Sequence, residues 1–178
     1  LAWLLAAGWS LSALSALAAD GTWNVNAAGN WTDAANWTPG IRLMTKPHAR
    51  HGDSPFSGAK ILSWSMNLTM LEEAQSKGFD EMLLLDHRGN VSECTSANIF
   101  LVEGSSVVTP PLSSGCLPGV TRAILLEEIS IPGITVSEAE IDPARLLDAD
   151  DVFITSSTRD LLPVSQIDDR TLPSKPAV

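Results

Sequence analysis

Apolar residues in the range 41–167 show two kinds of spacing, which alternate along the chain and together predict a mixed fold. Short apolar runs bounded by turn residues are typical of strands, whereas apolar residues three and four apart indicate one face of a helix. The predicted strands are Ile41–Met44, Met82–Leu85, Val91–Glu93, Ile99–Val102, Val107–Thr109, Ile134–Ile141, Asp151–Thr155 and Leu161–Val164. The predicted helices follow Lys60 and Gly119, with a short helical turn at Pro143–Leu147. The sequence therefore predicts an α/β domain of the mixed, α+β kind.

The helix after Lys60 has apolar residues at helical spacing between Met66 and Ala74, and we expect it to end at Gly78. A serine before the apolar run, Ser63 or Ser65, is expected to cap its start.

Two further local features concern the connections of this domain. The polar run Lys46–Ser54 predicts a loop before Lys60, and Asp86–Asn90 predicts a tight turn. That turn would reverse the chain so that Glu93 returns beside the start of the helix that follows Lys60.

Residues 1–40 differ in character from the rest of the chain. They contain no Lys or Arg, and five of the six tryptophans lie in them. Residues 1–19 form an apolar run similar to a secretory signal peptide, with a buried or membrane-spanning helix as the alternative. Residues 20–40 contain a six-residue Asn/Trp/Thr repeat, typical of repetitive β-structure or of a flexible linker. We therefore expect a boundary near residue 40, made by a fusion or by a join in the sequence assembly, and a loose tail at 168–178.

Charge and cysteine content narrow the function classes. The net charge is -10, from 11 basic and 21 acidic residues, and basic residues are not clustered, which argues against a nucleic-acid surface. The two cysteines, Cys94 and Cys116, lack zinc-ligand spacing and are too few for a disulfide framework. We expect two free thiols in a reduced compartment.

The stretch from Glu93 to Arg122 carries the candidate chemistry. It reads Glu-Cys-Thr-Ser-Ala-Asn-Ile-Phe from Glu93, then a predicted hairpin, and then Leu-Pro-Gly-Val-Thr-Arg from Leu117. A helix that opens at Gly119 presents free backbone N–H groups, and the Thr121 hydroxyl lies beside them, so an anion could be held there.

This stretch resembles, in order and spacing, the signature of the class-IV pyridoxal-phosphate aminotransferases. That family includes branched-chain and D-amino-acid aminotransferases and aminodeoxychorismate lyase. The resemblance covers residues 41–167 and implies the large domain of a fold-type-IV enzyme that uses pyridoxal 5'-phosphate (PLP). Residues 1–40 do not resemble the family's small N-terminal lobe, which supplies an arginine to the phosphate, and the chain has no tyrosine to place near the cofactor.

The resemblance assigns a role to each candidate site residue. Lys60 lies 33 residues before Glu93, the spacing of the lysine that binds the cofactor covalently and moves the substrate α-proton. Glu93 would hold a proton on the pyridine nitrogen. The remaining cofactor-binding residues would be Leu117 on the ring face and Val120, Thr121, Ser156 and Ser157 at the phosphate. The alternative for Lys60 is an ordinary surface lysine, and for the two serines a polar end of a strand.

The implied activity is transfer of an amino group between an amino acid and a 2-oxo acid, which would be the two substrates. Elimination of pyruvate, as in aminodeoxychorismate lyase, is the alternative within the family. An inactive secreted or envelope-associated fusion is the alternative outside it. We expect no nucleic-acid partner and no membrane contact for the enzyme domain, a homodimer as in other family members, and a cytoplasmic location, although residues 1–19 point to export.

Overall fold

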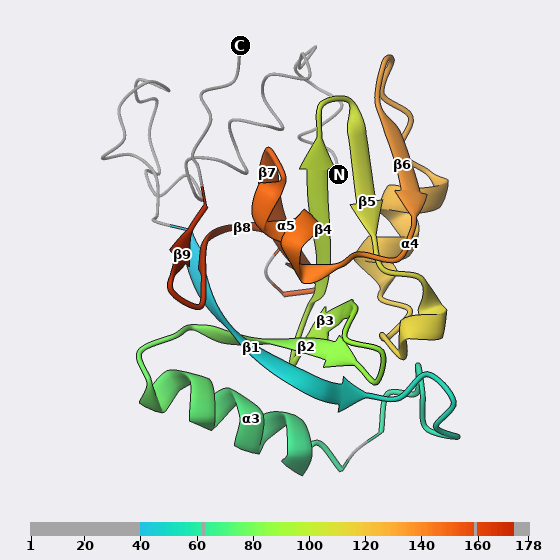
Figure 1. Cartoon of the computed structure of the whole chain (residues 1–178). Coiled ribbons are helices and arrows are strands. Elements are labelled where there is room, and N and C mark those ends of the chain that lie inside the picture. Colours follow the sequence, from blue (N-terminus) through green and yellow to red (C-terminus); the bar gives the residue numbers. More distant parts are fainter. Residues whose placement is uncertain (1–39, 62, 159, 173–178) are drawn as a thin grey trace.

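A computed structural model describes residues 40–61, 63–158 and 160–172 of the chain (Figure 1). The signal-like segment 1–19 and nearly all of the repeat segment 20–40 lie outside the described residues. The strands are β1 (Ile41–Arg50), β2 (Glu81–Asp86), β3 (Val91–Cys94), β4 (Asn98–Glu103), β5 (Ser106–Thr109), β6 (Thr135–Glu138), β7 (Asp151–Ser156), β8 (Asp160–Ile167) and β9 (Arg170–Thr171). The helices are α3 (Ser65–Ser76), η2 (Leu112–Ser114, a single 3-10 turn), α4 (Val120–Glu127) and α5 (Pro143–Asp148).

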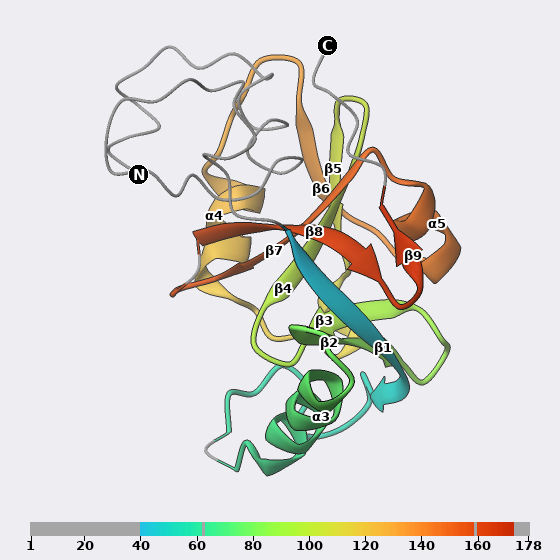
Figure 2. The same cartoon turned by 90° about the vertical axis from the view of Figure 1, so that its left-hand side faces the viewer.

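The strands form one sheet in the order β3-β2-β1-β8-β7-β4-β5-β6, with β9 paired to β8. β1 is parallel to both β2 and β8, whereas β2–β3, β4–β5, β4–β7 and β7–β8 are antiparallel. The mixed α/β class predicted from the sequence is therefore confirmed. Because β8 joins the two halves of the sheet, the strand that carries Glu93 and the strand that carries Ser156 belong to one framework (Figure 2).

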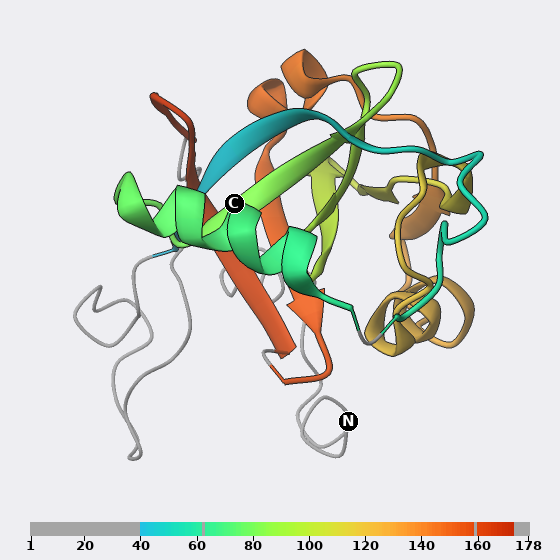
Figure 3. The same ribbon diagram turned by 90° about the horizontal axis from the view of Figure 1, so that it is seen from below.

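Helix α3 covers β1 and β2, and a small apolar cluster holds it there. Met70 and Ala74 of α3 pack with Met82 and Leu84 of β2, and all four are nearly or fully buried. Figure 3, seen from below, shows α3 crossing these strands and the segment before it running from the end of β1 toward α4. The segment that carries Lys60 therefore connects β1 to α3.

A larger apolar cluster fills the opposite part of the domain. It is built from buried residues of most of the strands, with Leu43, Leu83, Ile99, Leu101 and Ile154 almost completely excluded from solvent. At about 25 cal/mol per Å² of apolar surface buried, this cluster is the main source of fold stability. It also fixes the register of β4 against β7, where Asn98 faces Thr155.

The connection from β3 to β4, which follows Glu93, is fixed by a buried carboxylate. Glu81 of β2 is fully buried and accepts hydrogen bonds from the hydroxyls of Thr95 and Ser96 and from the Met82 amide. A buried polar group is stable only when it is hydrogen-bonded, so these contacts specify one conformation of the connection.

Several predicted boundaries differ from the structure. The first half of the expected loop Lys46–Ser54 is strand, because β1 continues to Arg50 by pairing with β2. The strand expected at Ile134–Ile141 is shorter, at Thr135–Glu138, and the expected loose tail begins with β9. Neither Ser63 nor Ser65 caps α3. The N-cap position is Trp64, whose indole group carries only an N–H donor and therefore cannot accept from the free amides of the first turn.

Candidate functional site

Glu93 is a buried carboxylate with two protein partners. It is 7% exposed, and Arg50 Nε donates to its Oε1 at 2.8 Å while the Leu117 amide donates to its Oε2 at 2.9 Å. Burial raises the pKa of Glu93 above its ordinary value, and the positive charge of Arg50 and the two hydrogen bonds oppose that rise. Each carboxylate oxygen has a second lone pair, so Glu93 can accept one more N–H donor from the pocket.

Arg50 and Asn67 complete this cluster, and the sequence analysis missed both. Arg50 Nη2 donates to Asn67 Oδ1 at 3.0 Å, and Asn67 Nδ2 donates to the Thr95 carbonyl at 2.8 Å. Arg50 is the last residue of β1, in a segment predicted as a polar loop, and Asn67 lies in the first turn of α3. No periodicity marks either residue, since their roles come from pairing between distant segments.

The start of α4 is shaped to receive an anion. Its first helical hydrogen bond runs from the Ala123 amide to the Gly119 carbonyl, so the amides of Val120 and Thr121 have no acceptor within the helix. No side chain caps the helix, and no acidic residue lies in its first turn. The helix dipole therefore places partial positive charge at this point.

Gly119 is required by the close approach of Asn98. A Cβ added at Gly119 would lie 2.1 Å from Asn98 Oδ1, well inside any normal contact. Asn98 Nδ2 donates to the Leu117 carbonyl at 2.8 Å. Asn98 therefore has a structural role, because its amide ties β4 to the segment before α4.

Hydroxyl groups at the end of β7 face the same region. Ser156, Ser157 and Thr158 follow one another, and the hydroxyls of Ser156 and Thr158 lie 3.3 Å apart. Thr155 is 1% exposed, and its Oγ1 has no hydrogen-bond partner. A buried hydroxyl without a partner is unusual in proteins and occurs here next to a candidate binding site.

One pocket of about 670 Å³ brings these features together. All seven residues predicted for the site line it: Lys60, Glu93, Leu117, Val120, Thr121, Ser156 and Ser157. Thr155 and Trp64 also line the pocket. Lys60 is exposed and lies in the segment between β1 and α3. The pocket therefore has an amine, an oriented carboxylate and an anion-binding helix start around one volume of the size that small-molecule ligands need.

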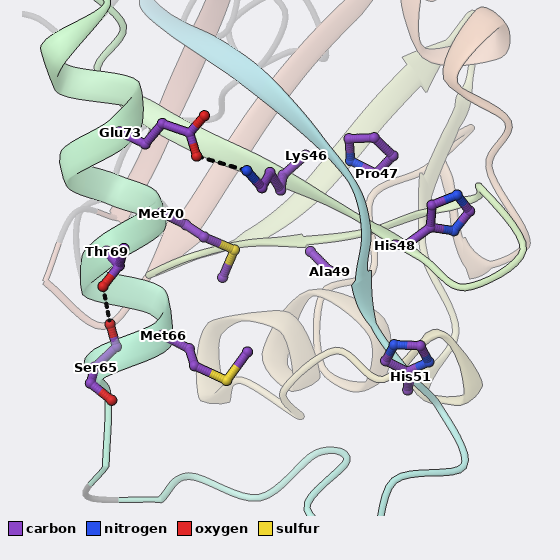
Figure 4. Close-up of a pocket in the computed structure, with 10 residues that line it drawn as sticks. All are labelled: Lys46, Pro47, His48, Ala49, His51, Ser65, Met66, Thr69, Met70 and Glu73. Atoms are coloured by element: carbon purple, nitrogen blue, oxygen red, sulfur yellow. Dashed lines mark hydrogen bonds and ion pairs between the residues drawn. The ribbon is translucent and has the colours of Figure 1, made fainter.

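A second, more open pocket of about 500 Å³ lies between the end of β1 and α3 (Figure 4). Ala49, His51 and Met66 line both pockets. Its charged pair is already formed, since Lys46 Nζ lies 2.7 Å from Glu73 Oε2, and Lys46 and Lys77 lower the pKa of Glu73 to about 2. None of the seven predicted site residues lines this pocket.

The described ranges 40–61, 63–158 and 160–172 hold neither a metal-binding cluster nor a membrane-spanning helix. They contain no group of three or more His, Cys, Asp or Glu side chains that could bind a metal ion. No helix in those ranges is both long enough and apolar enough to cross a bilayer.

The residues around the larger pocket fit pyridoxal 5'-phosphate. The start of α4 has unsatisfied amides and a glycine that leaves room for close approach, which suits a phosphate. Glu93 offers a carboxylate acceptor to a protonated ring nitrogen. Lys60 offers an amine within the lining of the same pocket.

Known proteins support the same assignment. A putative branched-chain-amino-acid aminotransferase of Methanocaldococcus jannaschii is 34% identical over 137 residues, which is 76% of this chain and 48% of the relative. The branched-chain aminotransferase of Thermoproteus uzoniensis, solved with norvaline, has a TM-score of 0.70 and 30% identity, covering 77% of this chain and 47% of that one. A putative 4-amino-4-deoxychorismate lyase of Legionella pneumophila has a TM-score of 0.73 and 28% identity, covering 77% and 51%.

The chain thus spans less than half the length of such curated relatives, 48% of the Methanocaldococcus jannaschii protein and 39% of one from Synechocystis. Residues 5–167 match the sequence model of the family described as amino-transferase class IV, so the match begins ahead of the boundary expected near residue 40. On this match and on the shared fold, the chain belongs to the class-IV aminotransferases.

Proposed function

We propose that this protein transfers an amino group between an amino acid and a 2-oxo acid, with pyridoxal 5'-phosphate held in the larger pocket. The observation that supports this most directly is the buried Glu93 carboxylate, fixed by Arg50 and the Leu117 amide in a pocket that Lys60 also lines. The cofactor, when bound, supplies an electron-accepting ring that stabilises negative charge on the substrate α-carbon.

Two residues would carry the proton chemistry. Lys60 would bind the cofactor through its Nζ and then move a proton to and from the substrate α-carbon. Glu93 would keep a proton on the ring nitrogen, because an ionised carboxylate beside that nitrogen favours its charged form.

The remaining residues would position the cofactor. The Val120 and Thr121 amides at the start of α4, with the hydroxyls of Thr121, Ser156 and Ser157, would bind the phosphate. Leu117 would contact the ring face through its side chain, while its amide holds Glu93.

An elimination reaction that releases pyruvate is a second candidate. It is favoured by the likeness of the fold to the Legionella pneumophila protein named as a putative 4-amino-4-deoxychorismate lyase. Both reactions use the same lysine and carboxylate at the first step, so the pocket supports either. Pyruvate formed from aminodeoxychorismate in the absence of a 2-oxo acid would identify the lyase reaction.

A homodimer and a cytoplasmic location are part of the same proposal. Amino acids, 2-oxo acids and free cofactor are abundant in the cytoplasm, and the family resemblance implies a dimer. Light scattering of the purified chain at several concentrations would test the dimer. Fractionation of the native cells would test the location, and recovery of the chain outside the cytoplasm would overturn that part.

Covalent capture of the cofactor tests the proposal. The protein is incubated with PLP, reduced with borohydride and mapped by mass spectrometry, and we expect the label on Lys60. Lys77→Ala, which changes a lysine that does not line the pocket, should be labelled like the wild type, and Lys60→Ala should not be labelled. A label spread over several lysines, or none, would refute cofactor binding and favour the inactive fusion. If Lys60 is labelled, amino transfer to 2-oxoglutarate is then measured on protein that has been incubated with PLP but not reduced.

A further inference from the structure

Arg50, Asn67 and Glu93 form a chain of hydrogen bonds that joins three separate elements. Arg50 ends β1, Asn67 lies in the first turn of α3, and Glu93 lies in β3. The donor–acceptor distances are 2.8 Å from Arg50 to Glu93 and 3.0 Å from Arg50 to Asn67. Asn67 then donates to the Thr95 carbonyl at 2.8 Å, two residues beyond Glu93. These hydrogen bonds therefore link β3 to the connection that directly follows it.

The burial of this pair sets it apart from the surface ion pairs. The side chains of Arg50 and Glu93 are 17% and 10% exposed, whereas those of Arg42 and Asp80 are 47% and 45% exposed. Exposed pairs contribute little because water screens them, while removing one partner of a buried pair leaves an uncompensated charge. Glu93 therefore depends on Arg50 for its ionised form.

Asn67 limits the freedom of Arg50. A guanidinium group donates through several N–H groups in a fixed plane, so a second acceptor at Nη2 fixes the direction in which Nε points. Asn67 uses both ends of its amide, accepting from Arg50 and donating to Thr95. Asn67 lies in α3, which follows the Lys60 segment, and it ties that helix to the connection directly after the strand that carries Glu93.

We propose that Arg50 and Asn67 act as one positioning unit, which keeps Glu93 an ionised and correctly aimed acceptor and couples it to the position of helix α3. The claim that Glu93 accepts from a ring nitrogen rests on the function proposed above. The effect of Arg50 and Asn67 on Glu93 does not rest on it, because all of these contacts lie within the protein.

The charged and titratable groups that face Glu93 are few among the described residues. Arg50 approaches from β1, and Cys116 lies close enough on the segment before α4 for Glu93 to contribute to its raised pKa, after the larger effect of burial. His51 and Lys60 line the same pocket. Burial is the main force that raises the pKa of Glu93, and Arg50 is the main group that opposes it.

The test follows the protonation of Glu93 in the cofactor-free protein. Infrared difference spectra taken across a pH titration detect the C=O stretch of a protonated carboxyl group, and Glu93→Gln identifies the band. We expect Arg50→Met to raise the proton affinity of Glu93 about tenfold or more, and Asn67→Leu to raise it about threefold. Leucine favours helix more than asparagine does, so Asn67→Leu does not weaken α3 by propensity. Arg42→Met, at the exposed pair, should leave the band unchanged.

A double variant shows whether the two residues act as one unit. With Arg50 replaced by methionine, Asn67→Leu should have no further effect on the Glu93 band, because Asn67 acts through Arg50. Independent effects of the two substitutions, or an unchanged titration in Arg50→Met, would overturn the proposal.

Binding of PLP, followed by its absorbance, separates this inference from the proposed function. Arg50→Met should raise the dissociation constant about tenfold or more, and Asn67→Leu should raise it less. A wild-type protein that binds no PLP would refute the proposed function, while the infrared titration would still decide the role of Arg50 and Asn67. Wild-type binding that Arg50→Met does not weaken would refute the inference alone.

Discussion

Substituting Gly119 tests how tightly the start of α4 is packed. Gly119 has φ -68° and ψ 147°, which alanine adopts without strain, so Gly119→Ala would by itself stabilise the fold by ~0.4–1 kcal/mol through the unfolded chain. The added Cβ, however, would lie 2.1 Å from Asn98 Oδ1. Since carbon and oxygen rarely approach closer than about 3 Å, the Asn98 amide or the helix start must move by about 1 Å.

The size of the effect follows from what holds Asn98. It is 6% exposed, and its Nδ2 donates to the Leu117 carbonyl, so it cannot turn away without breaking that bond. Overpacking of this kind costs about 1–3 kcal/mol, which outweighs the entropic gain. We expect Gly119→Ala to lower the free energy of unfolding by about 1–2 kcal/mol.

Urea denaturation of a variant cycle measures this directly. Asn98→Ala alone should cost about 1–2 kcal/mol, because the Leu117 carbonyl loses its partner. The double variant should cost no more than Asn98→Ala, since the clash has been removed. Gly104→Ala serves as a control, because no atom lies within 4 Å of its added Cβ. It should lower the free energy of unfolding through its φ of +56° alone, and this cost should add to that of Asn98→Ala. Additive costs of Gly119→Ala and Asn98→Ala would refute the steric argument.

Three further changes test other parts of the structure. Thr155→Val should raise the free energy of unfolding by about 1 kcal/mol in chemical denaturation because it removes an unpartnered hydroxyl, whereas Thr109→Val should lower it by about the same amount because that hydroxyl donates to the Ile99 carbonyl at 2.8 Å; equal effects would contradict this. The raised pKa of Glu93 means that the folded protein keeps a proton which the unfolded chain has released, so wild-type stability should fall relative to Glu93→Gln as pH rises from 4.5 toward the folded pKa, and a parallel pH profile of the two proteins would refute it. Asp168→Ala should lower the melting temperature, with a cost of about 1–2 kcal/mol, because Asp168 has φ +50° and accepts a hydrogen bond from the Thr45 amide at 2.8 Å. Asp168→Asn keeps the acceptor oxygen and tolerates this φ, so it should cost less, and a loss equal to that of Asp168→Ala would contradict both reasons.

The parts of the fold that the sequence predicts correctly are those set by local pattern. The apolar run before Asp86 is a buried strand, and the helical spacing from Met66 to Ala74 is a helix. Lys60, Glu93 and Thr121 line one pocket. Local pattern alone does not predict this, and the expectation comes from the residue spacing of the family that the chain resembles. Without it, Glu93 would be interpreted as an ordinary solvated residue at the end of a strand.

The parts that it does not predict depend on contacts between distant segments. The second half of β1 contains Pro47 and His48, and His48 has φ +53°, so local propensity indicates a loop. Pairing with β2 overrides that preference, with a shift of register between Lys46 and Arg50. The shift delivers the Arg50 side chain to Glu93, and no signal within the segment itself specifies that contact.

The two ends of the pocket differ in the groups that interact with charge. At Glu93 the positively charged guanidinium of Arg50 lies in direct contact with the carboxyl group, and both side chains are largely buried. At the start of α4 the groups available to an anion are backbone amides and hydroxyls, which are neutral and need no counter-ion of their own. Because Arg50 is already paired with Glu93, an anion at α4 does not compete for it. The chain can therefore carry a net charge of -10 and still present an anion-binding end, since local dipoles rather than net charge determine the potential there.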